Sequence, residues 1–329
     1  MHKKLLKDIG EKELIKRLAK FMPNNQVSDD CGFVKSKKNN IIVNTDALVE
    51  NVHFSEDTIS PLDLGWKAVA SNISDLLSSG SKKTIGITIN LIIPAKTKLG
   101  WIEELYTGVN QALNHYGGVI IGGDCSLGKE KVISIAALGV QGELKLRRNA
   151  CKPGEIILTT GIHGLSKLGF MIKSDNDFFD SDVFLTEKLI SESLQQFWRP
   201  RLKPNFHKKL LKTRTNKKIT KIGCTDSSDG LIQALKDLSI ESNCKAIIDF
   251  EKLPKHKDWP QGDEWDKYYF YGGEDYKLVF SLPKKWAKNC LKIDKNIREI
   301  GYFSKGEAKV EFTNPKKNTI LNSQPFSHF

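Results

Sequence analysis

Long apolar runs are missing from this chain of 329 residues. No stretch approaches the ~18 consecutive apolar residues that a membrane helix requires. Residues 1–20 lack the apolar centre of a signal peptide, and their spacing of leucines and isoleucines predicts an amphipathic helix. We therefore expect a cytoplasmic protein with no membrane partner.

Cysteine occurs in no pattern that indicates a site. The six cysteines are widely separated, and none forms a C-x-x-C pair. This spacing argues against a zinc ribbon or a disulfide framework. We expect reduced and mostly buried thiols, which is the usual state of cysteine in the cytosol.

Three common signatures of nucleotide-binding proteins are absent as well. The sequence has no G-x-x-x-x-G-K-[ST] loop, so it is not a P-loop kinase. It has neither H-R-D nor D-F-G, the pair typical of protein kinases, and no G-x-G-x-x-G after a strand. Any nucleotide must therefore bind by another arrangement.

The net charge of +12 raises nucleic acid as a partner. The basic residues lie in short scattered clusters at 35–38, 208–218 and 284–295, without an RNA-binding aromatic signature. An anionic small substrate fits the same charge. We expect no nucleic acid, and a basic nucleic-acid-binding protein stays as an alternative.

Strand-like and helix-like segments alternate along the chain, which predicts an α/β (α+β) fold with mixed sheets. A polar, turn-rich stretch at 147–154 marks a boundary between domains 1–146 and 147–329. Predicted strands cover 41–45, 48–54, 84–93, 119–121, 132–140, 155–160, 219–224, 246–250, 278–282 and 297–301. Predicted helices cover 62–79, 99–116, 186–196 and 231–242, and a further helix is expected after Gly164.

A series of aspartates carries the chemical signal. Several follow a short apolar strand, and several adjoin glycine; they are Asp29, Asp30, Asp46, Asp75, Asp124, Asp226, Asp229 and Asp275. A carboxylate at a strand end is held rigidly near a crevice, and Mg²⁺ prefers such oxygens. Glycine beside it lets backbone N–H groups approach phosphate. Each instance alone is typical of a turn, except Asp75, which lies in a helix-like stretch and alone would be typical of a solvent-facing charge. Converging carboxylates, however, would repel one another unless cations lay between them. The set therefore predicts a site for several metal ions.

With these segments in this order, the sequence resembles the thiamine-monophosphate kinase family. The stretches that carry the resemblance are NTDALVENVHF, LGWKAVASNISDLLSSGS, IIGGDCSLG, RNACKPGE, TDSSDGL and YGGEDYKLVFSLP. The family shares a superfamily with aminoimidazole ribonucleotide synthetase, selenophosphate synthetase and a hydrogenase-maturation protein. The resemblance implies direct in-line phosphoryl transfer from ATP to thiamine monophosphate with Mg²⁺, in which positioning and charge neutralisation provide the catalysis.

The resemblance also implies a set of site residues. The implied metal positions are Asp30, Asn44, Thr45, Asp46, Asp75, Asp124, Asp226 and Asp229. The implied nucleotide positions are Gly123, Asp124, Arg148 and Ser228, and the implied substrate positions are His53, Glu274, Asp275 and Phe326. Asp46, Asp124 and Asp229 are expected to be the most critical, with no separate catalytic group. A packing role for His53, an anchoring role for Phe326 and a shift from Arg148 to Arg147 stay open.

The chain departs from the family pattern at several positions, without losing a matched carboxylate. They are Ser28, Asn44, Cys125, Ser126, Ser227 and Lys277. The resemblance further implies a homodimer in which the N-terminal sheets pair into a β-barrel, and a C-terminal α/β sandwich. Two alternatives within this reading are another ATP-dependent superfamily member that acts on a different small nucleophile, and a homologue without catalytic activity.

Overall fold

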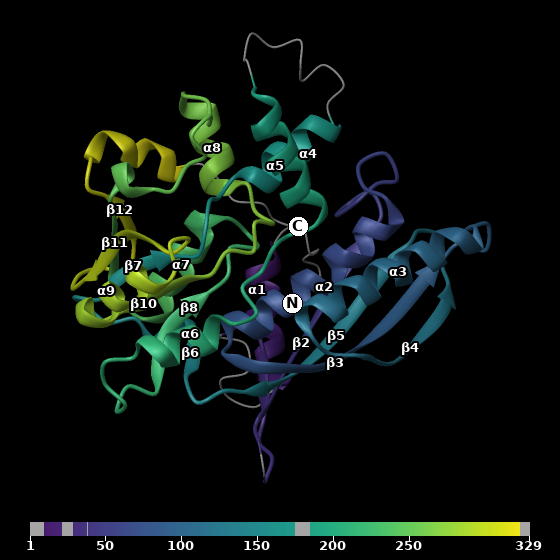
Figure 1. Ribbon diagram of the computed structural model, residues 1–329, viewed down its shortest axis with the longest axis horizontal. Helices are drawn as coiled ribbons and strands as arrows, with labels where there is room; N and C mark the ends of the chain where they lie inside the picture. Colours follow the sequence, from purple (N-terminus) through teal and green to yellow (C-terminus); the bar gives the residue numbers. More distant parts are fainter. Residues whose placement is uncertain (1–9, 22–28, 38, 175–184, 323–329) are drawn as a thin grey trace.

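Two mixed sheets form the framework of the computed structural model, which describes residues 10–21, 29–37, 39–174 and 185–322 (Figure 1). The five-stranded sheet has the order β1-β2-β5-β3-β4, and the seven-stranded sheet has the order β12-β9-β11-β7-β10-β8-β6. Most neighbours are antiparallel, whereas β3–β4, β6–β8 and β9–β12 are parallel. The predicted α/β class with mixed sheets is confirmed.

The bounds of the elements are as follows. The first sheet contains β1 (Gly32–Val34), β2 (Ile41–Val49), β3 (Ser81–Ile93), β4 (Ile120–Leu127) and β5 (Val132–Gln141). The second contains β6 (Lys145–Arg147), β7 (Ile156–Thr159), β8 (Lys221–Thr225), β9 (Lys245–Ile248), β10 (Val279–Leu282), β11 (Arg298–Ser304) and β12 (Val310–Phe312). The helices are α1 (Gly10–Leu18), α2 (Pro61–Ser78), α3 (Leu99–Tyr116), α4 (Leu165–Ser174), α5 (Glu187–Trp198), α6 (Phe206–Thr213), α7 (Leu231–Glu241), α8 (Asp263–Tyr271) and α9 (Lys284–Ile293).

Helices α2 and α3 cover one face of the first sheet, and α2 lies where this sheet meets the second half of the chain (Figure 1). Ser60 caps α2 by accepting a hydrogen bond from the N–H of Asp63 at 3.1 Å, and Pro61 follows at the first helical position. The two helices touch through glycine. A Cβ at Gly65 would overlap the carbonyl oxygen of Leu105, and one at Gly108 would overlap that of Leu62. Only glycine permits this approach of two backbones.

Two sequence expectations about strand ends are wrong. The stretch 48–54 is not a separate strand: β2 runs unbroken to Val49, and the chain then turns through Asn51, whose φ is +64°. The aspartates of the first sheet also do not follow strands. Asp46 lies inside β2 and Asp124 inside β4, because both strands continue their ladders past these residues, β2 with β5 and β4 with β3.

In the described part of the second half, three helices lie where the sequence analysis predicted none: α6, α8 and α9. Helix α8 has the sequence DEWDKYYFY, whose aromatic residues are weak helix formers, and packing of Trp265, Tyr269 and Phe270 stabilises it. The first sheet ends at Gln141 and the second begins at Lys145. The exact domain boundary at 146/147 stays a prediction. None of the helices among the described residues is long and apolar enough to cross a membrane.

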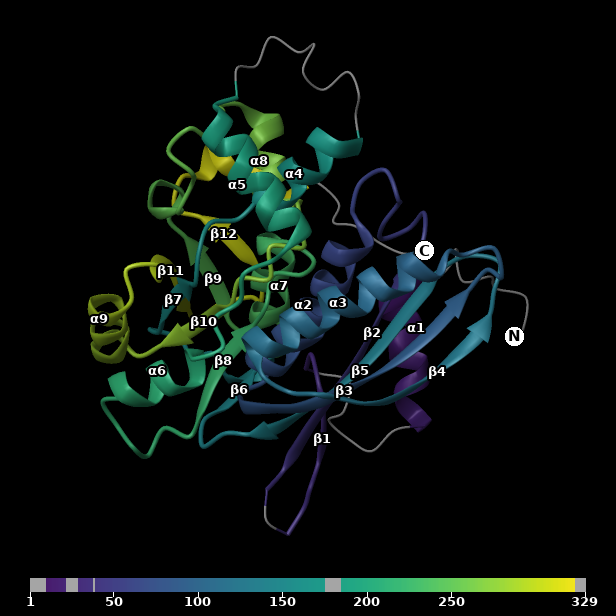
Figure 2. The same ribbon diagram turned by 45° about the vertical axis from the view of Figure 1, so that its right-hand side comes forward.

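Strand β4 forms the outer edge of the first sheet (Figure 2). Its side chains are almost all exposed, and they include large apolar ones: Ile121 is 53% and Leu127 is 78% exposed. Val119, just before the strand, is exposed too. An edge strand that carries exposed apolar side chains is an unusual surface for a protein to leave in water.

Candidate active site

One face of helix α2 presents polar side chains to the second half of the chain. The hydroxyl of Ser74 donates to Asp226, which directly follows β8, and the hydroxyl of Ser78 donates to Asp30. Between them, Asp75 accepts a hydrogen bond at 3.0 Å from the amide of Asn44 on β2. Positions three and four apart lie on the same side of a helix. Helix α2 therefore brings together carboxylates from three distant segments.

The carboxylates of Asp30, Asp46 and Asp226 lie close enough to Asp75 for their charges to act on it. Burial raises the pKa of Asp75 well above its usual value, and the charges of Asp226, Asp30 and Asp46 raise it further. Burial and the charge of Asp30 raise the pKa of Asp226 to about 7. Like charges held together in this way favour binding of a cation. We call these four residues the carboxylate cluster.

Arg148 supplies the positive charge of the site. Its guanidinium contacts Asp30 of the carboxylate cluster, donates to the hydroxyl of Thr225 at 3.1 Å, and lies 3.7 Å from Asp237 on α7. Arg147 points elsewhere: it stacks on Phe33 at 3.5 Å. Of the two arginines, Arg148 is therefore the one that reaches the carboxylate cluster, and its role in phosphate binding stays a prediction.

The donor set fits a magnesium ion. The side-chain carbonyl oxygen of Asn44 is buried and has no hydrogen-bond partner among the described residues, while the amide nitrogen of the same side chain donates to Asp75. Within the described part of the chain, no three His, Cys, Asp or Glu side chains surround one point as a closed metal site would. Mg²⁺ commonly takes only one or two carboxylates and completes its shell with water and substrate phosphates. The cluster suits such an open site.

Two predicted metal residues lie apart from the cluster. Thr45 points to the opposite face of β2 from Asp46 and donates to the carbonyl of Ile135. Asp124 is in register with Asn90, Ser134 and Ala47 across β4, β3, β5 and β2. Asp124 therefore lies three strand spacings, about 14 Å, from β2. Because successive side chains of a strand point to opposite faces, Asp124 lies on the face of the sheet opposite Asp46. Gly123 lies beside it, packed so closely on Ile89 that no Cβ fits.

Two turns from the second half meet beside the carboxylate cluster. The turn after β8 contains Ser228, which donates through its hydroxyl to Asp226 at 2.9 Å, and the exposed Asp229. The second turn is 272–276, in which the N–H of Glu274 donates to the carbonyl of Ser228 at 2.7 Å. The predicted nucleotide and substrate segments are thus adjacent in the structure.

Glu274 and Asp275 have different surroundings, although they are neighbours in sequence. The carboxylate of Asp275 is buried and accepts from the N–H groups of Gly164 and Ser166 at the start of α4. Burial raises its pKa to about 6. The side chain of Glu274 stays 33% exposed. Of the two carboxylates, Glu274 is therefore the one that a ligand can reach, and Asp275 stabilises the turn.

The remaining predicted substrate residues are less informative. His53 lies in the turn after β2, and its Nδ1 accepts from the N–H of Val49 at 3.1 Å, so a neutral ring carries its proton on Nε2. Phe326 lies outside the described residues. So does Ser28, one of the departures from the family pattern.

Sequence reasoning missed several residues of this site. Ser74, Ser78 and Thr225 hold the carboxylates through their hydroxyls. The serines of α2 could have been found from the sequence. They recur at helical spacing among apolar residues, which predicts that this face of the helix is buried. The role of Thr225 depends on contacts between distant segments and leaves no local signal.

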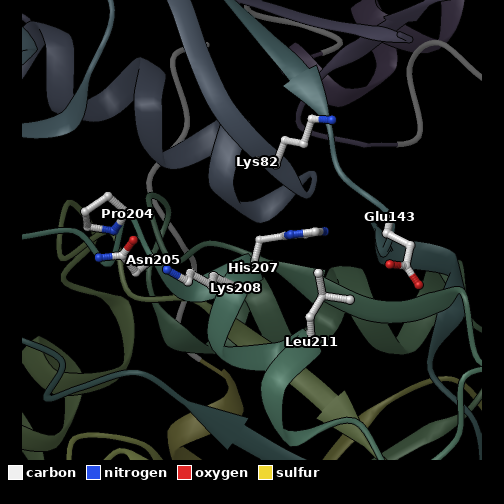
Figure 3. A pocket seen from close by; sticks show the side chains of 7 residues that line it. All are labelled: Lys82, Glu143, Pro204, Asn205, His207, Lys208 and Leu211. Atoms are coloured by element: carbon white, nitrogen blue, oxygen red, sulfur yellow. The ribbon is translucent and has the colours of Figure 1, made fainter. Parts of the chain in front are cut away.

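A separate cavity of about 400 Å³ lies between the start of β3 and helix α6 (Figure 3). His207 projects into it between Lys82 and Leu211, and its Nε2 accepts from the N–H of Leu144. The other lining residues are Glu143, Pro204, Asn205 and Lys208. None of the predicted site residues lines this cavity, so it is distinct from the carboxylate cluster.

The fold and the carboxylate cluster together define an AIR synthase-related protein, and residues 28–141 match the family model "AIR synthase related protein, N-terminal domain". Over 325 residues the chain is 42% identical to thiamine-monophosphate kinase of Prochlorococcus marinus, covering 99% of this chain and 97% of that one. The chain belongs to the thiamine-monophosphate kinase family. The predicted enzyme class, thiamine-phosphate kinase, is confirmed.

Solved structures agree with this assignment. AaThiL complexed with AMPPCP and TMP superposes with a TM-score of 0.81 at 26% identity, covering 100% of both chains. Thiamine monophosphate kinase from Aquifex aeolicus gives 0.77 at 26% identity, covering 94% of this chain and 98% of that one. The HypE–HypF complex, at 17% identity and a TM-score of 0.72, shares the fold.

Proposed function

We propose that the chain transfers the terminal phosphoryl group of ATP directly to the phosphate of thiamine monophosphate. A bond forms between the γ-phosphorus and a phosphate oxygen of the acceptor, the bond to the β-phosphate oxygen breaks, and ADP leaves. The observation that carries this mechanism is the carboxylate cluster beside Arg148, at the junction of the two halves of the chain. A related protein, AaThiL, binds an ATP analogue and TMP.

The residues of the chain position and neutralise the phosphates. Asp30, Asp46, Asp75, Asp226 and the carbonyl oxygen of Asn44 would hold Mg²⁺, which supplies neutralisation of phosphate charge when it is bound. Arg148 offers a forked guanidinium to a phosphate. Because the attacking phosphate oxygen is already anionic, no general base is required. Ser228 and Asp229 belong to the turn that supports Asp226.

On the substrate side, we assign the thiamine moiety to the turn that contains Glu274. Glu274 is partly exposed beside the Ser228 turn, whereas Asp275 fixes the start of α4. A carboxylate in this position attracts the positively charged thiazolium ring of thiamine. His53 and Phe326 are proposed to complete this side of the site.

The test is formation of thiamine diphosphate from ATP and thiamine monophosphate, measured with and without Mg²⁺. We expect ADP release that depends on both the acceptor and the metal. Aminoimidazole precursors and selenide serve as controls and should not stimulate it. Stimulation by one of them instead of thiamine monophosphate would assign the chain to a different reaction of the superfamily.

We also propose that the protein is a homodimer joined through the β4 edge of each copy. Pairing would cover Ile121 and Leu127 and would provide partners for the backbone groups of an edge strand. It would continue the first sheet into that of the second copy, in line with the barrel that the sequence resemblance implies.

In such a dimer, we propose that Asp124 from one copy enters the site of the other. Within one chain, Asp124 is three strands away from Asp46 and on the other face of the sheet. Its position on β4 places it at the proposed contact between copies. Gly123 and Asp124 of one copy would then reach the nucleotide bound in the other copy, although they lie too far from the nucleotide site of their own chain.

A heterodimer carrying Asp46→Asn on one subunit and Asp124→Asn on the other, purified with two affinity tags, is expected to recover about half of the wild-type activity, because one of its two sites is intact. The matched control places both substitutions on the same subunit, beside a wild-type subunit, and is expected to be inactive. The reverse pattern, an inactive first heterodimer and a half-active control, would place Asp124 in the site of its own chain.

For the location of the protein, we propose the cytoplasm. The six cysteines are free, and all except Cys125 are buried. Unpaired thiols in this number are typical of a reducing compartment.

A further inference from the structure

Lys67 is buried at the junction of the two halves and has no role in the site described so far. It belongs to α2, its side chain is 1% exposed, and its Nζ lies 2.8 Å from a carboxylate oxygen of Glu274. The ammonium also lies 4.3 Å from the ring centroid of Phe197 on α5. Removing an ammonium group from water is unfavourable unless a close partner compensates for it. The pairing with Glu274 provides this compensation.

Glu274 has a backbone conformation that neighbouring contacts must maintain. Its φ is +55°, and that of Tyr276 is +49°. Both values lie in the left-handed region, which residues other than glycine rarely adopt. Such strain persists only where surrounding contacts hold it, and it occurs preferentially at functional sites. Here the turn is held by the Ser228 carbonyl, by Asp275 at the start of α4, and by Lys67.

Lys67 connects this turn to the carboxylate cluster through a single helix. It lies two helical turns before Asp75, on the helix whose Ser74 and Ser78 hold Asp226 and Asp30. A helix of this kind is a rigid spacer. The distance from the Glu274 carboxylate to the carboxylate cluster is therefore determined by the Lys67–Glu274 contact and by the rigid part of α2 between Lys67 and Asp75.

We infer that Lys67 is a positioning residue that orients the Glu274 carboxylate for the thiamine substrate. This inference rests on the proposed function, in which Glu274 contacts that substrate. Lys67 is only 1% exposed and holds one oxygen of Glu274, whereas the side chain of Glu274 is 33% exposed and open to a ligand. Its loss should therefore change the affinity for thiamine monophosphate much more than that for ATP.

The experiment compares Lys67→Met with the wild-type enzyme, because Met has a similar length and no charge. We expect the KM for thiamine monophosphate to rise by about 10- to 100-fold, the range typical of residues that orient a ligand-contacting group. The KM for ATP should stay within about twofold of the wild-type value, well below that range. Glu274→Gln should give the same pattern. The double variant should be no worse than the more impaired single variant, because both substitutions break one interaction.

The matched control is Lys209→Met, which removes another close ion pair, between Lys209 and Asp294 at 2.6 Å. It should leave both KM values unchanged. An unchanged KM for thiamine monophosphate in Lys67→Met would overturn the inference and leave Lys67 with a purely structural role. Should Lys67→Met not fold, Lys67→Arg decides, because it keeps the charge but shifts its contact with Glu274: the same selective rise in the KM for thiamine monophosphate is expected, and an unchanged KM overturns the inference. A wild-type enzyme that does not respond to thiamine monophosphate would instead contradict the proposed function.

Discussion

Asp46→Asn is expected to lower the rate of thiamine diphosphate formation by about 10³-fold, the scale on which lost electrostatic stabilisation of a transition state acts. The substitution keeps the size of the side chain and removes a charge from the carboxylate cluster. Asp46 accepts from the N–H of Ala47 at 2.9 Å, and the Asn carbonyl can accept the same bond. The fold should therefore survive, and steady-state rates at saturating Mg²⁺ measure the loss.

The same variant should be at least as stable as the wild-type protein when no metal is bound. Asp46 contributes to the repulsion that raises the pKa of Asp75, so its neutralisation relieves that repulsion. A gain of ~1 kcal/mol would raise the melting temperature by up to about 3 °C. Asp249→Asn is the matched control, since Asp249 also accepts a local backbone bond but lies outside the cluster. Near-normal turnover of Asp46→Asn would remove Asp46 from the site.

Arg148→Ala is expected to impair both nucleotide binding and stability. It removes the guanidinium that contacts Asp30 and Thr225, and it leaves the carboxylate of Asp30, whose side chain is 5% exposed, without its cation. Losing one partner of a buried ion pair costs about 3 kcal/mol of unfolding free energy. We expect the KM for ATP to rise by about 100-fold, as a charge-assisted bidentate contact is lost. Initial rates at varied MgATP and urea denaturation measure the two effects.

Two further variants separate the role of Arg148 from general damage. Arg148→Lys should not restore the wild-type KM, because an ammonium cannot span Asp30 and Thr225 as the planar guanidinium does. Arg147→Ala should lower stability by removing the stacking on Phe33, with little change in the KM for ATP. If Arg147→Ala raised the KM and Arg148→Ala did not, the assignment of the two arginines would have to be exchanged.

The sequence was informative where a local pattern determines the structure. Helix α3 has the predicted bounds, and α2 differs from its prediction by one residue at each end, because apolar residues at helical spacing and clear end signals mark both. The order of the aspartate segments also predicted a shared site, and the contacts of Asp30, Asp75 and Asp226 agree with it.

The details of that site depended on information that no local pattern contains. Neighbouring residues of a strand point to opposite faces, so Asp46 faces the cluster while Thr45 does not, and this follows from the pairing of β2 with β5. The separation of Asp124 follows from the strand order of the whole sheet. The different surroundings of Glu274 and Asp275 depend on a turn with unusual backbone angles.

The glycine contact between α2 and α3 has a consequence for ion binding. With backbone touching backbone at Gly65 and Gly108, α2 has no free space in which to slide or rotate against its neighbour. The packing of the two helices therefore opposes the mutual repulsion of the carboxylates even when no cation is bound. Arriving ions meet preorganised oxygens, and their binding energy need not be spent on rearranging the backbone.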